Sequence, residues 1–257
     1  MDPITLVIVC PLVFLAGLVD SIAGGGGLIS LTAYLLAGLP AHTALGTNKL
    51  SSAVGTAVAC GRMARGGFVQ WRLALPAAVG ALAGSAAGAR LALLVPDGVF
   101  QMLMVVALPL VAVAVLRKRT FDESEDGALA APSISPRRQL AVVVAAALLV
   151  GCYDGFYGPG TGTFMLLAFT VFAKLPVKDA SGEVRVANLA SNVAACVMFL
   201  AHGVVWVELG LVAAVFSVAG NYIGSGLVMK DGSRIVRPIV VVVLALLFAK
   251  VLFDLVG

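Results

Sequence analysis

Long apolar stretches separated by short polar breaks run along almost the whole chain. Ten such segments can be drawn, at approximately 4–22, 27–38, 42–61, 73–95, 98–116, 139–157, 162–173, 181–201, 206–228 and 235–255. An α-helix needs about 20 apolar residues to cross a hydrocarbon core of about 30 Å, and most of these segments have that length. The pattern predicts an all-α, polytopic transmembrane helix bundle of about 8 to 10 membrane segments.

Composition supports a lipid environment. Apolar residues make up 61% of the 257 positions and charged residues only 12%, against roughly 25% charged in soluble domains. The net charge of +4 does not indicate a nucleic-acid partner, because the Lys and Arg residues flank apolar segments. The four cysteines lie inside apolar segments without Cys-x-x-Cys spacing, so we expect no metal and no cofactor.

One long hydrophilic stretch, "RKRTFDESEDGALAAPSISPRR" at 117–138, divides the chain into a first membrane repeat at 1–116 and a second at 139–257. Its charge, Ser and Pro content predicts a flexible linker. If this linker is cytoplasmic and every segment crosses, thirteen Lys and Arg residues lie in cytoplasmic connections, against Arg90 and Lys250 outside. Because positive charge concentrates on the cytoplasmic side, we expect a multi-pass protein of the cell (inner or plasma) membrane with a cytoplasmic linker.

The two halves resemble each other in sequence. A shift of 136 positions aligns Lys49 with Arg185, and a shift of 134 aligns Asp20 with Asp154. The loop "GRMARGGFVQWR" is basic, whereas its counterpart "LAHGVVWVE" has no Lys or Arg. This change of charge indicates two inverted-topology repeats, each with an odd number of crossings.

Both halves are interrupted by glycine. "AGGGG" at 23–27 and "YGPGTGT" at 157–163 each precede a segment of about 12 residues, too short for an untilted crossing. Glycine costs a helix interior about 1 kcal/mol relative to alanine, so these runs end helices. Unpaired backbone is not tolerated against lipid, and paired broken half-helices are typical of a transport site near the midplane. The alternative is that the glycines only permit close packing, as we expect for Gly80, Gly84 and Gly88.

The N-termini of the short segments are candidate anion sites, because free N–H groups and the helix dipole favour an oxyanion. The residues concerned are Gly25, Gly26, Gly27, Gly160, Thr161 and Thr163.

Two cations lie within apolar segments, Lys49 and Arg185. Such side chains are rarely left facing lipid, so we expect both to point inward and to bracket an anion. The alternatives are that both reach a membrane surface, or that Arg185 pairs with Glu183. Neutral polar residues that suit a multi-oxygen ligand surround the cations: Thr47, Asn48, Asn188 and Asn192.

Three acidic residues are candidates for coupling or structural roles. Asp20 and Asp154 immediately precede the glycine breaks, and Glu183 occurs in one half only. The aspartates could hold the unwound backbone, neutralise Lys49 or Arg185, or carry a proton if burial disfavours their charged form.

At these residues the chain resembles the TauE/SafE sulfite exporter family, also called the toluene-sulfonate uptake permeases, and within it the YfcA-like branch. The motifs that carry the resemblance are "GLVDSIAGGGGL", "GLPAHTALGTNKLSS", "GCYDGFYGPGTGTF" and "ANLASN". The resemblance implies a secondary transporter of sulfur-containing oxyanions such as sulfite, sulfoacetate or other organosulfonates, coupled to protons. It also implies about eight helices, fewer than the ten segments drawn above, unless the short ones are re-entrant.

The residues leave other functions open. An anion channel, or a carrier of another small organic anion, would use the same basic, glycine-lined pathway. An enzyme is not indicated, because the sequence shows no nucleophilic triad, His-rich metal motif or phosphate loop. The expected partners are a small anionic substrate and the lipid bilayer, and the oligomeric state stays open.

Overall fold

The computed structural model describes residues 2–100, 102 and 134–231, and within these ranges all regular structure is helical. The predicted all-α bundle is therefore confirmed for this part of the chain. Segment 235–255 and all but the first residues of segment 98–116 lie outside the described residues. The helices are α1 (Pro3–Ala23), α2 (Gly26–Leu36), α3 (Ala41–Arg65), α4 (Trp71–Leu94), α7 (Pro136–Phe156), α8 (Thr161–Val171), α9 (Val177–Ala201) and α10 (Val207–Asp231).

Five of the described helices are long and apolar enough to cross a membrane: α1, α4, α7, α9 and α10. Helices α2 and α8 have 11 residues each, and α3 has 25 residues but is rich in polar ones. One boundary differs from the prediction, because α7 begins inside the stretch 117–138 taken as linker. Ser135 caps this helix by accepting from the Arg138 N–H at 3.4 Å, and Pro136 fits its first turn.

The helices of the two halves match in length and order. Helices α1 and α7 have 21 residues each, α2 and α8 have 11, and α3 and α9 have 25, while α4 has 24 and α10 has 25. Pro40 and Pro176 precede α3 and α9 with φ of −56° and −55°. Corresponding segments of the sequence therefore form corresponding helices.

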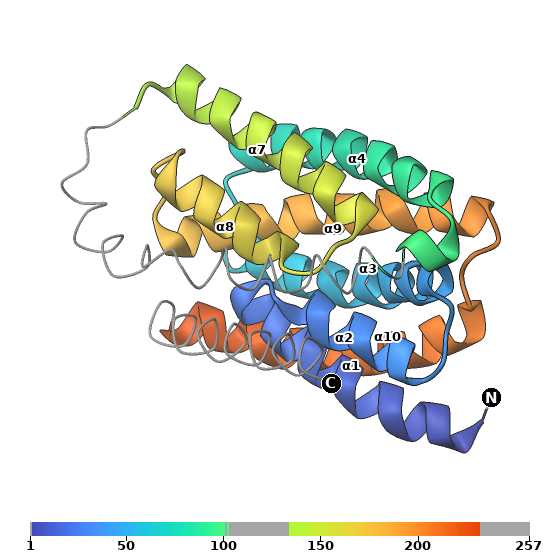
Figure 1. Ribbon diagram of the computed structural model, residues 1–257. Helices are drawn as coiled ribbons and strands as arrows, with labels where there is room; N and C mark the ends of the chain where they lie inside the picture. Colours follow the sequence, from blue (N-terminus) through green and yellow to red (C-terminus); the bar gives the residue numbers. More distant parts are fainter. Residues whose placement is uncertain (1, 101, 103–133, 232–257) are drawn as a thin grey trace, which may run out of the picture.

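The long helices form two layers, each built from both halves of the chain. Helices α1, α3 and α10 make one layer, and α4, α7 and α9 make the other (Figure 1). Helix α1 packs on α10 as α7 packs on α4, and α3 packs on α10 as α9 packs on α4. Helices α3 and α9 meet between the layers. The short helices α2 and α8 lie against α1 and α7, respectively.

The two layers run in opposite directions. Along α1 and α10, Gly17 lies against Ser217 and Gly224 lies against Leu18, so these helices are parallel. The start of α3 meets the end of α9, since a Cβ on Gly46 would lie 3.1 Å from the Cβ of Phe199. Helices α3 and α9 are therefore antiparallel.

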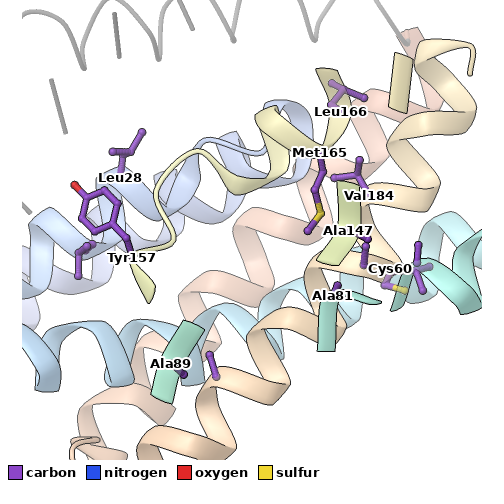
Figure 2. Packing of buried hydrophobic residues seen from close by; sticks show 14 of the residues in the cluster. Leu28, Cys60, Ala81, Ala89, Ala147, Tyr157, Met165, Leu166 and Val184 are labelled. Carbon is purple, nitrogen blue, oxygen red and sulfur yellow. The ribbon is translucent and has the colours of Figure 1, made fainter. Parts of the chain in front are cut away.

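Small residues bring the helices of each layer close together. A Cβ on Gly84 or Gly88 of α4 would collide with the carbonyl oxygens of Leu148 or Cys152 on α7, and one on Gly80 would lie 3.0 Å from the Val144 oxygen. The packing role expected for the three glycines is thus confirmed. Figure 2 shows Ala81 and Ala147, which belong to this same stretch of α4 and α7.

Candidate functional site

The two glycine breaks touch each other at the centre of the molecule. Gly24 ends α1 with φ of +75°, and Gly25 caps the start of α2. Gly158, with φ of +97°, and Gly160, with φ of +82°, carry the turn from α7 into α8. A Cβ on Gly24 would collide with the main chain of Gly162. At this contact the glycines allow close packing, and the left-handed φ values explain why other residues would be strained there.

Lys49 is buried and paired with an aspartate from the other half. Its side chain is 2% exposed, and its Nζ lies 2.7 Å from Oδ1 of Asp154, whose side chain is 3% exposed. The Thr161 hydroxyl donates to the same carboxylate at 2.8 Å, and the Ser191 hydroxyl contacts the second oxygen. Lys49 therefore does not reach a membrane surface.

Arg185 makes the corresponding pair in the opposite sense. Its Nη1 lies 2.9 Å from Oδ2 of Asp20, and the Asn188 amide approaches the same oxygen at 3.5 Å. The Arg185 side chain is 4% exposed and that of Asp20 is 17% exposed. The alternative pairing of Arg185 with Glu183 is not the one that the structure forms.

Each cation thus balances a carboxylate from the other repeat, with a net formal charge of zero. Buried pairs of this kind are weak evidence for stability, because desolvation offsets the attraction between the charges. Titratable pairs inside a membrane protein instead favour a functional interpretation.

A small cavity opens beside the two pairs. It collects residues from both glycine breaks and from the central helices α3 and α9. The lining residues are Asp20, Gly24, Gly27, Asn48, Lys49, Ser52, Asp154, Gly158, Thr161, Asn188 and Asn192. The Asn192 side-chain amide donates to the main-chain carbonyl oxygen of Asn188 at 2.9 Å, which holds this side chain against α9.

Most of the predicted site residues line this cavity, and the others have different surroundings. Gly26 packs on α1, with Ala16 and Asp20 where its Cβ would be, and Gly25, Gly160 and Thr163 lie in the turns or first turns that lead into α2 and α8. Three side chains remain. Arg185 pairs with Asp20 but is not among the residues that line the cavity, while Thr47 and Glu183 contact the starts of α10 and α4. Thr47 accepts from the Trp206 N–H at 2.9 Å, and Glu183 accepts from the Gln70 N–H at 2.7 Å.

A second polar cavity adjoins the first and was not anticipated from the sequence. It shares Asp20, Gly27 and Ser52, and extends between α1, α2, α3 and α10 to Thr56 and Asn221. Within the described part of the chain, Thr56 Oγ1 and Asn221 Oδ1 are buried without a hydrogen-bond partner. The sequence feature that could have indicated this cavity is Asn221, a polar residue in the otherwise apolar helix α10. Inside a membrane such a side chain points to the protein interior.

These observations define a class of protein: a multi-pass helical membrane protein with a buried, charge-balanced centre between broken helices. The profile of the family described as "Sulfite exporter TauE/SafE" matches residues 9–251, and the chain belongs to this family. The family is one of membrane transporters, so the chain is a multi-pass transporter-family protein of the inner membrane.

Several relatives support this assignment. The chain is 35% identical to "Probable membrane transporter protein ORF9" of Sinorhizobium sp, over 94% of this chain and 90% of the relative. It is 32% identical to a "Probable membrane transporter protein" of Haemophilus influenzae, over 94% and 92%. It is 31% identical to "Probable membrane transporter protein YfcA" of Escherichia coli K12, over 99% and 92%. No solved structure matches the chain.

Proposed function

We propose that this protein is a secondary transporter, not an enzyme, that moves small sulfur-containing oxyanions such as sulfite, sulfoacetate or other organosulfonates with coupled protons. The family description suggests sulfite, whereas the named relatives are called only probable membrane transporters. The observation that carries the proposal is the pair of crossed ion pairs, Lys49 with Asp154 and Arg185 with Asp20, where the two broken helices meet.

An anion binds at this centre by sharing the cations. Lys has three N–H donors and Arg has five, so each can hold its aspartate and a ligand oxygen together. Asn48, Asn188 and Thr161 line the same cavity; the two amides add neutral donors, while the Thr161 hydroxyl already donates to Asp154. The N–H groups at Gly25, Gly26, Gly160 and Thr163 belong to helix starts, whose positive dipole ends also favour an oxyanion.

The balanced charge of the centre connects anion binding to proton binding. Two cations and two carboxylates carry no net charge, so an anion that enters alone leaves an uncompensated negative charge in a poorly hydrated place. An anion that enters with one proton leaves the formal charge unchanged if the anion is monovalent. We therefore assign the coupling to protonation of an acidic residue in or near the site.

Alternating access follows from two inverted repeats, at 1–116 and 139–257, joined by a cytoplasmic linker at 117–138. The matched helix lengths and the opposed directions of the two layers support this arrangement. The layers meet at α3 and α9, which carry Lys49 and Arg185. Rocking of one layer against the other therefore opens the site to one side of the membrane at a time.

The test is flux of labelled sulfite, sulfoacetate and taurine into proteoliposomes, with and without an imposed pH gradient. The variant is the double substitution Lys49→Met with Asp154→Asn, which removes the cation without leaving a buried charge. The matched control is Lys230→Met at the end of α10, away from the cavity. We expect saturable, gradient-driven flux that the double variant loses and the control keeps.

Rapid flux that does not saturate and ignores the gradient would overturn the carrier mechanism in favour of an anion channel. Full flux in the double variant would overturn the proposed site.

A further inference from the structure

The starts of α4 and α10 are each capped by a side chain from the other half of the chain. Thr47 of α3 accepts from the main-chain N–H of Trp206 at 2.9 Å, and Oε1 of Glu183 on α9 accepts from that of Gln70 at 2.7 Å. Positions 47 and 183 are separated by 136 residues, as are positions 70 and 206. One structural position is thus filled by a neutral hydroxyl in one half and by a carboxyl group in the other.

Glu183 is in surroundings that disfavour its charged form. Glu183 is fully buried, with 0% exposure, and its Oε2 has no hydrogen-bond partner within the described ranges. In the same part of the chain, no Lys or Arg forms an ion pair with it, since Arg185 and Lys49 are engaged by Asp20 and Asp154. A buried carboxylate without a cation costs several kcal/mol unless it takes up a proton.

Among the described residues, the recorded contacts of Glu183 include no Lys or Arg side chain. The charged group of its own helix that faces it is Asp179, whose carboxylate accepts from the Gln70 side chain at 3.1 Å. The segment between α3 and α4 supplies the N–H of Gln70, which donates to Glu183. In the same segment, the carbonyl of Phe68 packs against Gly182, the residue next to Glu183. The Gln70 N–H and the positive end of the α4 dipole partly stabilise a negative charge on the carboxyl group, but the hydrogen bond serves Oε1 and leaves Oε2 without a recorded partner in the described ranges.

We propose, on the basis of the transport function above, that Glu183 is the proton-binding residue of the transport cycle. Its Oε2 takes up one proton from water and later returns it, while Oε1 keeps the hydrogen bond from Gln70. Asp20 and Asp154 keep their ion pairs with the two cations. The proton site is therefore separate from the anion cavity, which Glu183 does not line.

The position of Glu183 provides a reason for coupling. The segment 66–70 joins α3 to α4 and therefore connects the two layers. Loss of the proton leaves a charge that must be hydrated, and Gln70, whose N–H bonds Glu183, is exposed at this joint. Ionisation of Glu183 thus favours an arrangement in which water enters between α9 and the start of α4. Protonation of Glu183 favours the arrangement described here, in which its side chain is buried.

The experiment compares two transport modes in proteoliposomes with the membrane potential clamped at zero. Exchange of labelled for unlabelled sulfite requires no net proton movement, whereas accumulation against a concentration gradient does. One proton moving down about one pH unit supports about tenfold accumulation of a monovalent anion, equivalent to about 1.4 kcal/mol. The variants are Glu183→Gln and Glu183→Thr, the second reproducing the residue found at position 47. Glu208→Gln, at an exposed carboxylate in the first turn of α10, is the matched control.

We expect both Glu183 variants to exchange sulfite but to lose accumulation, and Glu208→Gln to accumulate as the wild type does. Accumulation at the wild-type level in a folded variant of either kind would overturn the proposal. If exchange and accumulation are both absent from wild-type protein, the transport function itself is wrong. If the wild type shows exchange and accumulation, and only the Lys49→Met, Asp154→Asn protein loses them, the transport function stands and Glu183 is excluded as the proton-binding residue.

Discussion

The pair formed by Lys49 and Asp154 allows a quantitative prediction for stability. Both side chains are nearly inaccessible, at 2% and 3% exposure, so removal of one partner leaves the other charge buried. Breaking such a pair typically costs about 3 to 5 kcal/mol, whereas replacing both partners by neutral groups of similar volume is often close to neutral. We expect Lys49→Met and Asp154→Asn to destabilise the protein strongly and the double variant to recover most of the loss.

The two single variants should not be equal. Lys49→Met leaves the Asp154 carboxylate with the hydroxyls of Thr161 and Ser191, and hydrogen bonds to charged groups contribute about 1.5 to 3 kcal/mol each. Among the described residues, the ion pair with Asp154 is the recorded polar contact of Lys49. Asp154→Asn should therefore cost more than Lys49→Met.

The assay is thermal unfolding of the four purified proteins in one detergent, analysed as a double-mutant cycle. A control cycle combines Lys49→Met with Thr56→Val, whose hydroxyl has no recorded partner in the described ranges, and should be additive. Additive losses for Lys49 and Asp154 would refute the buried ion pair, because the cycle would then contain no coupling energy.

Other consequences concern the glycine breaks and the helix starts. Gly24→Ala should prevent folding or insertion, because Gly24 has φ of +75° and a Cβ there would collide with Gly162. Gly27→Ala should fold normally, since the nearest atom is 3.6 Å from the position of its Cβ. Insertion yield measured by fluorescence chromatography distinguishes the two variants, and equal yields would contradict the packing described here. Because Gly27 lines the anion cavity, Gly27→Ala should also weaken sulfite flux in proteoliposomes, and unchanged affinity and rate would argue against that cavity as the site. Thr47→Val should lower the free energy of unfolding by about 1 kcal/mol without abolishing flux, because it removes the acceptor for the Trp206 N–H. A loss of transport without a loss of stability would instead assign Thr47 to the anion site.

Much of the helical arrangement could be predicted from local sequence. Apolar length located the helices to within a few residues, and glycine runs located the breaks before Gly26 and Thr161. The start of α7 was misplaced because a Ser–Pro pair can either end a polar linker or cap a helix, and here it caps. Such a choice depends on what the following turn packs against.

The site could be predicted only in part, because its partners come from opposite ends of the chain. Internal similarity singled out Lys49, Arg185, Asp20 and Asp154, but it could not show that each cation pairs across the repeats, over 105 and 165 positions. Thr47 stays a predicted ligand. Residues two positions apart on a helix point in different directions, so its position beside Lys49 in the sequence could not show that its hydroxyl accepts from the Trp206 N–H at the start of α10.

The central claim, that an anion binds between the crossed ion pairs, is tested most directly by equilibrium binding. The measurement is the thermal stabilisation of purified protein by sulfite and sulfoacetate, compared between the wild type and the Lys49→Met, Asp154→Asn variant. A ligand at 100 times its dissociation constant stabilises the folded state by about 2.7 kcal/mol. We expect a saturable stabilisation of the wild type that is absent from the folded double variant. Equal stabilisation of the two proteins, or none of the wild type by either anion, would contradict the account.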